Sequence, residues 1–229
     1  MADRLMDWNG VDAVGGHYSG VVGANTAPKA PSRPVGSFRY GGLFKSRPRV
    51  LGTWLVSSSD ARILDQVAEL FGGTLPDSHD AGQEPCVITD ATEIDVLLAG
   101  PEALNVDWRR QPGHVCDGCI QHDQRGSRPC ECPPELEDRT TAARAGHGCR
   151  PRAQVCFRLL QSPELGTFTF SSSNREFADQ ASRALASLRR DPRTTYARLR
   201  LHRTSHRLRS GTNVAYTRPT LELLGPVSS

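Results

Sequence analysis

Five cysteines lie close together in the middle of this 229-residue chain, at a spacing that suits the binding of a metal ion. They follow the pattern C-x2-C-x10-C-x-C-x16-C. Zinc takes four deprotonated soft ligands in a tetrahedron, and short cysteine pairs on tight turns supply two ligands each. Glycines and prolines beside the pairs provide the turn residues that such loops need. The candidate ligands are Cys116, Cys119, Cys130, Cys132 and Cys149.

Five cysteines compete for four positions, and three histidines, His114, His122 and His147, could replace one of them. The segment 108–152 holds almost no large apolar side chains, so burial alone cannot offset the entropy lost when it becomes ordered. A bound metal would fix such a segment. We therefore expect a structural zinc ion, while the choice of four ligands stays open.

Two other uses of these cysteines are weaker. A disulfide or redox pair would need an oxidising compartment or a thioredoxin-like frame, and the sequence around the CxxC has no such frame. The chain start lacks the pattern of a signal peptide, and no stretch approaches the roughly 20 apolar residues of a membrane span. We therefore expect a cytoplasmic protein with reduced thiols.

A catalytic zinc would keep an open position and a nearby general base, for which Asp117 and Glu131 are the available carboxylates.

Other signs of catalysis are missing from the sequence. There is no P-loop, no GxGxxG after a strand and no GxSxG. The two runs of three serines are better explained as strand ends and helix caps than as nucleophiles. We therefore expect no enzyme activity and no small-molecule substrate.

Two segments on either side of the cysteines resemble each other. Residues 51–70 and 165–184 align without a gap and share eight identities in twenty positions. Each copy predicts a strand, "TWLV" or "TFTF", followed by serines and then by apolar residues at helical spacing. Asp60 or Ser59 can cap the first helix, and Ser173 with Glu176 forms a capping box for the second. Gly72-Gly73 and Asp191-Pro192 predict the two helix ends.

Further strands and an uneven charge distribution complete the pattern. "PCVITD" and "IDVLLA" suit strands after the first helix, where Cys86, like Cys156 later in the chain, is expected to be a small core residue. "YARLRLHR" and "NVAYTRPTLELL" suit a hairpin with an arginine-rich face.

Residues 57–107 carry eleven acids and one base, whereas residues 175–229 carry eleven arginines and four acids. The two halves either neutralise each other or present the basic half to an acidic partner or to nucleic acid.

These features predict an α+β fold. It would hold two related strand–helix repeats in a mixed or antiparallel sheet, with an inserted cysteine-rich zinc loop. The expected parts are a flexible N-terminal arm at 1–36, a first α/β repeat at 37–107, a zinc-binding insert at 108–152 and a second α/β repeat with a basic hairpin at 153–229.

The order of motifs also resembles a known family. "FRYGG", "LGTWLVSSSDARILDQVAELFGG", "CDG…PCECP" and "CRPRAQVCFRLL…LGTFTFSS" are similar to the recombination directionality factors of actinophages with large serine integrases, typified by phage phiC31. The resemblance covers roughly residues 38–224. Its cysteine run falls on Cys116, Cys130, Cys132 and Cys149, which it implies as the zinc ligands, although Cys119 keeps the choice of four from five open.

The resemblance implies a regulator of prophage excision. Such factors bind the integrase, at its C-terminal zinc-containing region and the base of its coiled coil, on attachment-site DNA. They redirect recombination from attP × attB to attL × attR, with little direct DNA binding of their own. Charge alone suggests the partner-binding residues, which are Arg198, Arg200, Arg203, Arg207 and Arg209.

Two other functions follow from the same residues. A zinc-containing DNA-binding transcriptional regulator would use the arginine-rich hairpin against phosphates, but the acidic first half would repel DNA and no recognition helix is evident. A zinc nuclease or hydrolase would need a water in place of a fourth protein ligand.

Overall fold

The computed structural model describes residues 33–44, 47–74, 84–110, 114–116, 120–123, 126–133, 136–146, 148–207, 211 and 213–227. These residues belong to one unit, Arg33–Ser229. The expected arm at 1–36 lies outside the described residues up to position 32, and Gly36 already begins the first strand. Among the described residues, no helix is both long enough and apolar enough to cross a bilayer.

The described strands form one 12-stranded sheet with three α-helices and two short 3-10 helices. The strands before the cysteines are β1 (Gly36–Phe44), β2 (Arg47–Ser57), β3 (Cys86–Ile88), β4 (Glu93–Leu98) and β5 (Leu104–Arg110). The cysteine-rich segment contributes β6 (His114–Cys116), β7 (Ile120–Asp123) and β8 (Gly126–Pro129). The remaining strands are β9 (Arg150–Leu159), β10 (Phe168–Ser172), β11 (Thr195–Arg207) and β12 (Asn213–Pro226). The helices are α1 (Ala61–Phe71), η1 (Pro101–Ala103), α2 (Leu136–Arg144), η2 (Pro163–Leu165) and α3 (Arg175–Arg190).

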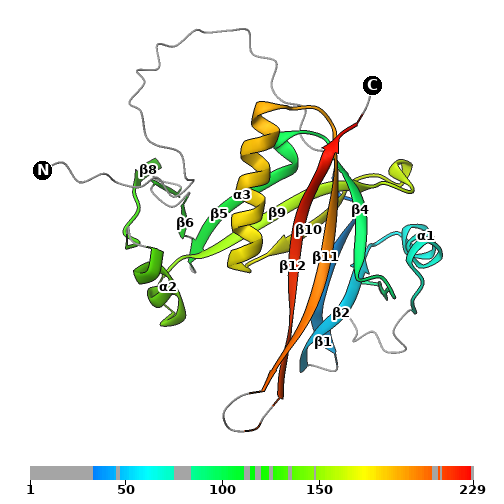
Figure 1. Cartoon of the computed structure of the whole chain (residues 1–229), viewed down its shortest axis with the longest axis horizontal. Helices are drawn as coiled ribbons and strands as arrows, with labels where there is room; N and C mark the ends of the chain where they lie inside the picture. The colour runs from blue at the N-terminus through cyan, green and yellow to red at the C-terminus, as the bar shows by residue number, and fades with distance from the viewer. Residues whose placement is uncertain are drawn as a thin grey trace, which may run out of the picture. The chain divides into compact units, whose positions relative to one another are not determined.

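The sheet runs in the order β3-β2-β1-β10-β9-β5-β6-β7-β8, and a second branch leaves β9 through β4 to β11 and β12 (Figure 1). Of the pairs among described strands, β1–β10 is parallel and the others are antiparallel. The predicted α+β class with a mixed sheet is therefore confirmed. The strand β5 crosses the expected boundary at 107/108, and β6, β7 and β8 continue the same sheet.

The core lies between the two branches. Alternate residues of β9, namely Ala153, Val155, Phe157 and Leu159, point into it, as do Ile94 and Val96 of β4 and Ala197 and Leu199 of β11. Phe38 is its aromatic centre, with ring centroids 5.4 to 5.9 Å from those of Trp54, Phe157 and Phe168. The alternation corrects one prediction: Cys86 and Cys156 are half-buried, because the buried neighbours Val87, Val155 and Phe157 take the core side of their strands.

The two aligned segments form the predicted strand and helix at equivalent positions. Asp60 caps α1 and Asn174 caps α3, each through its side-chain oxygen. The hydroxyl of Ser58 accepts from the Asp60 amide, and Ser172 does the same for Asn174. The predicted capping box of Ser173 and Glu176 is therefore wrong. Asn174 is one residue closer to the helix, and its side-chain oxygen accepts a hydrogen bond from the Phe177 amide. Buried positions also match, as Ile63, Leu64 and Val67 in α1 align with Phe177, Ala178 and Ala181 in α3. A common origin of the two segments stays a prediction.

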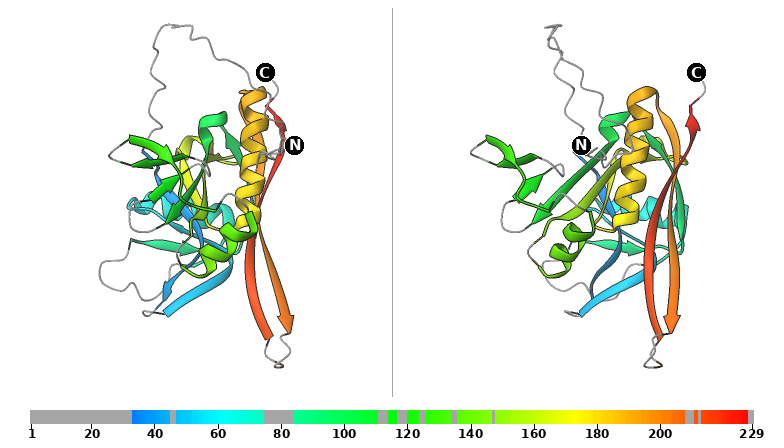
Figure 2. Two further views of the ribbon diagram at one scale, coloured as in Figure 1. Left: turned by 90° about the vertical axis from the view of Figure 1, so that its left-hand side faces the viewer. Right: turned by 60° about the vertical axis from the view of Figure 1, so that its left-hand side comes forward.

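Helix α3 protects the outer edge of the β11–β12 branch. It packs against β12, β9 and β5, and the Gln180 side chain accepts a hydrogen bond from the Leu221 amide at 2.9 Å (Figures 1 and 2). An unpaired strand edge would otherwise invite pairing with another chain. Arg218 of β12 also pairs with Glu176 of α3 at 2.7 Å.

Candidate metal centre

Four of the five candidate cysteines meet at one point of the fold. Cys116 ends β6, Cys130 and Cys132 follow β8, and Cys149 directly precedes β9. Their sulfur atoms all lie within 4.8 Å of one another. Cys119 and His147 lie outside the described residues, as do the side chains of His114 and His122.

The separations between the sulfur atoms indicate separate thiols around a common centre. Cys116 Sγ lies 3.8 Å from Cys149 Sγ, and Cys132 Sγ lies 2.9 Å from Cys149 Sγ. A disulfide requires about 2.05 Å, so neither pair is bridged. Zinc with four thiolates at about 2.3 Å places its sulfurs roughly 3.8 Å apart. The Cys116–Cys149 separation already has this value, and the cluster would adjust slightly at Cys132 to complete the shell.

The protein backbone and burial support this donor set. Cys116, Cys132 and Cys149 are buried and Cys130 is half-buried. The Cys132 amide donates to Cys130 Sγ at 3.4 Å. Amide donors of this kind stabilise thiolates at the turns that carry them. All four donors are soft sulfur atoms, which suits zinc better than a hard cation such as calcium or magnesium.

The thiols differ in acidity. Burial raises the pKa of Cys130 to about 12, and burial also raises the pKa of Cys149. Burial opposes ionisation of Cys132 too, but hydrogen bonds with the side chain and backbone of Cys149 and with the Cys130 side chain, together with the charge of Arg139, outweigh it, so the pKa of Cys132 is lowered. Without metal, Cys132 therefore gives up its proton more readily than Cys130 and Cys149, which tend to keep theirs. A divalent cation would displace those protons when it binds.

A buried cation lies beside the thiols. Arg139 of α2 is 6% exposed, and its Nε donates to the carbonyl oxygen of Pro133 at 2.9 Å, one residue after Cys132. Its guanidinium carbon lies 5.3 Å from the centroid of the Trp108 ring on β5. Trp108 pairs with Cys116 across β5 and β6. Sequence spacing gave no signal for Arg139 or Trp108, because their contact joins two elements far apart in the chain.

A glycine brings α2 close to the centre. The Gly148 amide donates to the Ala142 carbonyl at 2.8 Å, and a Cβ at Gly148 would collide with the backbone of Ala142 and Ala143. Cys149 follows directly. The absence of a side chain at 148 therefore lets the end of α2 pack onto the chain that carries this ligand.

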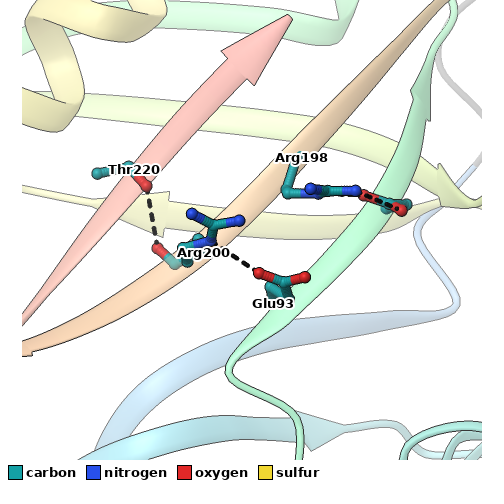
Figure 3. Close-up of polar contacts among 5 residues, drawn as sticks. Glu93, Arg198, Arg200 and Thr220 are labelled. Carbon is teal, nitrogen blue, oxygen red and sulfur yellow. Dashed lines mark hydrogen bonds and ion pairs between the residues drawn. The ribbon is translucent and has the colours of Figure 1, made fainter. Parts of the chain in front are cut away.

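The arginines predicted to bind a partner divide into two groups. Arg198 pairs with Asp95 at 2.7 Å and Arg200 pairs with Glu93 at 2.8 Å, both across β11 and β4 (Figure 3). The acidic and basic halves of the chain thus neutralise each other at this point. Arg203 and Arg207 are exposed and form no ion pair with a described residue. Arg209 lies outside the described residues.

Comparison with known proteins identifies a relationship over most of the chain. A family model described as Gp3-like, recombination directionality factor-like, matches residues 21–223. The match includes both aligned segments and the four cysteines. No solved structure matches the chain.

Proposed function

The chain belongs to the Gp3-like, recombination directionality factor-like family, and we propose that it binds a large serine integrase and reverses the direction of recombination. With the integrase alone, attP and attB are joined. With this factor bound, attL and attR are joined and the prophage is excised. The observation that carries the proposal is the family match over residues 21–223. Members of such a family regulate a recombinase rather than catalyse a reaction.

The switch works as a population shift. A regulator changes the outcome of a reaction between two arrangements of its partner only when it binds one arrangement better than the other. We place the contact at the C-terminal zinc-containing region of the integrase and the base of its coiled coil, where one arrangement favours excision. This action takes place on attachment-site DNA, in the cytoplasm of the bacterial host.

A rigid binding surface needs an ordered cysteine-rich segment. We propose that Cys116, Cys130, Cys132 and Cys149 hold a structural zinc ion. The convergence of their sulfur atoms within 4.8 Å supports this assignment. When bound, the ion links the end of β6, the segment after β8 and the start of β9. The chain's own residues complete the site: Arg139 offsets its negative charge and Gly148 allows the close approach of α2.

We propose that the arginines of β11 contact the integrase, although Arg198 and Arg200 lie on the opposite face of the strand from Arg203 and Arg207. Arg198 and Arg200 are already paired with acids, so they supply shape and directed hydrogen bonds more than net charge. Arg203 and Arg207 carry charge without an acidic partner among the described residues, to which Arg209 does not belong. The partner-binding role of these five arginines stays a proposal.

A binding experiment tests the proposed partnership. The integrase from the same phage, immobilised through a tag, is incubated with the purified zinc-loaded factor in the absence of DNA. We expect a complex in a defined ratio of the two proteins, retained by the integrase and not by an unrelated serine recombinase. Equal retention by both recombinases, or by neither, would contradict the proposed specificity.

A further inference from the structure

An open cavity lies where β5, β9 and β10 meet, and none of the four clustered cysteines lines it. β5 pairs with β9 from Arg150 onward, whereas β10 pairs with β9 only from Ala153 onward. The chain turns from β10 into α3 beside the first residues of β9, and the space left there has a volume of about 210 Å³ (Figure 1). The lining residues are Arg109, Arg150, Pro151, Arg152, Ser171, Ser172 and Ser173.

The lining of this cavity holds three arginines and no acid. Asp107 of β5 lies directly opposite Arg152 in the strand register. Its carboxylate is already used, because it accepts from Arg109 Nε at 2.9 Å and from Arg109 Nη2 at 2.7 Å. This paired contact holds the Arg109 guanidinium in one orientation and leaves its Nη1 hydrogens available to a ligand.

The two arginines of β9 differ in how they are held. Arg150 donates through Nη2 to the carbonyl oxygen of Ala143, near the end of α2, at 3.3 Å. Arg152 is half-buried and makes no hydrogen bond or ion pair with a described residue. Removing part of a cation from water without giving it a partner costs free energy. A bound anion would therefore stabilise Arg152 more than the other arginines of the lining.

Three consecutive serines complete the lining, and they have different roles. Ser172 is buried, and its hydroxyl oxygen accepts from the Asn174 amide at 3.1 Å, so it supports the start of α3. Ser171 and Ser173 are exposed, and their side chains make no hydrogen bond with a described residue. A serine hydroxyl can donate to an anionic oxygen. Two hydroxyl donors are therefore available beside the three guanidinium groups.

We infer that this cavity binds a phosphate group. The available donors of three arginines and two hydroxyls outnumber the roughly four lone pairs that a carboxylate offers, whereas a phosphate brings more acceptor oxygens. Sites for whole small molecules usually have about 300–1,000 Å³. A cavity of about 210 Å³ is smaller, so it suits one anionic group that a larger molecule presents. The backbone of DNA presents such groups, and free phosphate has the same chemistry.

The inference goes beyond the proposed function and can be tested apart from it. A contact with one phosphate gives only weak binding to free DNA. An integrase that holds both the factor and the attachment site would raise the local concentration of DNA near the cavity, so that a weak contact becomes occupied. The experiments below use the factor alone, so failure to bind an integrase would contradict the proposed function and leave the phosphate result standing.

A phosphorus NMR titration of inorganic phosphate with the purified protein tests the inference. The test variant is Arg152→Ala. The matched control is Arg158→Ala, which removes the same charge from an exposed position on the same face of β9, outside the cavity. We expect saturable binding by the native protein, roughly tenfold weaker binding by the test variant, and binding within about twofold of native by the control.

A second variant, S171A/S173A, keeps the charge of the cavity and removes two exposed hydroxyls. We expect it to bind phosphate about fivefold more weakly than the native protein. Unfolding temperatures measured without phosphate show whether each variant is folded. If Arg152→Ala is not folded, S171A/S173A decides the matter, and unchanged phosphate binding by this variant would contradict the inference.

A labelled DNA duplex of arbitrary sequence identifies the source of the phosphate group. By fluorescence anisotropy at low salt, we expect Arg152→Ala to bind the duplex more weakly than Arg158→Ala does. The slope of log K against log salt should flatten by about one unit in Arg152→Ala. Equal binding of the duplex by both variants, with inorganic phosphate binding lost in Arg152→Ala, would assign the cavity to a small phosphate compound instead.

Three results would overturn the inference. The native protein does not bind inorganic phosphate, or Arg158→Ala loses as much phosphate affinity as Arg152→Ala. In the third case acetate binds to the native protein as tightly as phosphate, which would indicate a site for a carboxylate of an acidic protein partner.

Discussion

The guanidinium carbon of Arg139 lies 5.3 Å from the centroid of the Trp108 ring, next to four clustered thiols. Both residues are buried, at 6% and 4% exposure. A buried arginine is costly unless it is hydrogen-bonded and close to negative charge. The proposed zinc ion with four thiolates would have a net charge of about −2 and would supply that negative charge. The pair of Arg139 and Trp108 therefore suits a place beside the proposed metal centre, and the first three predictions below concern the residues around it.

Replacement of Arg139 should weaken the zinc-loaded fold. Arg139→Met keeps the stem but removes the charge and the hydrogen bond to the Pro133 carbonyl, so we expect the free energy of unfolding to fall by about 2 kcal/mol. Arg144→Met, at an exposed position of the same helix, is the control and should change it by less than about 0.5 kcal/mol. Chemical denaturation monitored by tryptophan fluorescence measures both. Equal stability of the two variants would show that Arg139 does not support the centre.

Loss of one thiol should remove the metal. Cys149→Ser takes away the donor in contact with two other sulfurs, and we expect the zinc content to fall from about one ion per chain to a small fraction of that. Cys156→Ser is the matched control, because Cys156 is half-buried on β9 and lies outside the cluster. Elemental analysis of dialysed protein measures the ratio. Full zinc retention by Cys149→Ser would remove Cys149 from the ligand set.

Alkaline pH should distinguish the metal-free protein from the zinc-loaded one. Burial raises the pKa of Cys130 from 9.0 to about 12 in the folded, metal-free chain. Below pH 9 this thiol is protonated in both folded and unfolded states, so its contribution is fully present. Between about pH 9 and 12 the unfolded chain releases the proton first, and the metal-free fold loses stability.

The zinc-loaded protein should not show this loss, because its sulfurs are already deprotonated by the metal. Thermal unfolding from pH 8 to 11, with and without a strong chelator, measures the difference. Parallel pH profiles for the two forms would contradict a metal-bound Cys130.

The partly exposed ion pair of Arg198 and Asp95 should contribute little to stability. Its two side chains are 30% and 31% exposed, so solvent screens the attraction. A double-mutant cycle with Arg198→Ala and Asp95→Asn should give a coupling energy below about 1 kcal/mol. Urea denaturation of the four proteins measures it. A coupling of several kcal/mol would mean that this pair holds β4 to β11, rather than the strand ladder and the buried Val96 and Ala197 beneath it.

Local sequence patterns predict which residues form each strand and helix. They do not predict which of these elements lie next to each other in the fold. The alternation of Ala197, Leu199 and Leu201 against Arg198 and Arg200 fixed which face of β11 is buried, and burial confirms it. The parallel pairing of β1 with β10 had no local signal, since it joins residues 36–38 to 168–170. The sequence pattern predicts the cap of α3 at Ser173, one residue before the observed cap Asn174, because both residues suit a cap and only the backbone geometry separates them.

The convergence of four cysteines was predictable because cysteine is rare and its spacing carries chemical information. The residues that support them were not. Arg139 resembles any other surface arginine of a weakly amphipathic helix, and Gly148 resembles any other loop glycine. Their roles depend on how closely α2, β5 and the segment before β9 approach one another. Tertiary packing determines this approach, and local sequence carries no signal for it.

The direction of recombination tests the account most directly. Purified integrase from the same phage is mixed with attL and attR substrates, and the excised product is measured over a range of concentrations of the zinc-loaded factor. We predict almost no product without the factor and a saturable rise with it, together with a fall in attP × attB recombination in the parallel reaction. A yield from attL × attR that does not change with factor concentration would contradict the account.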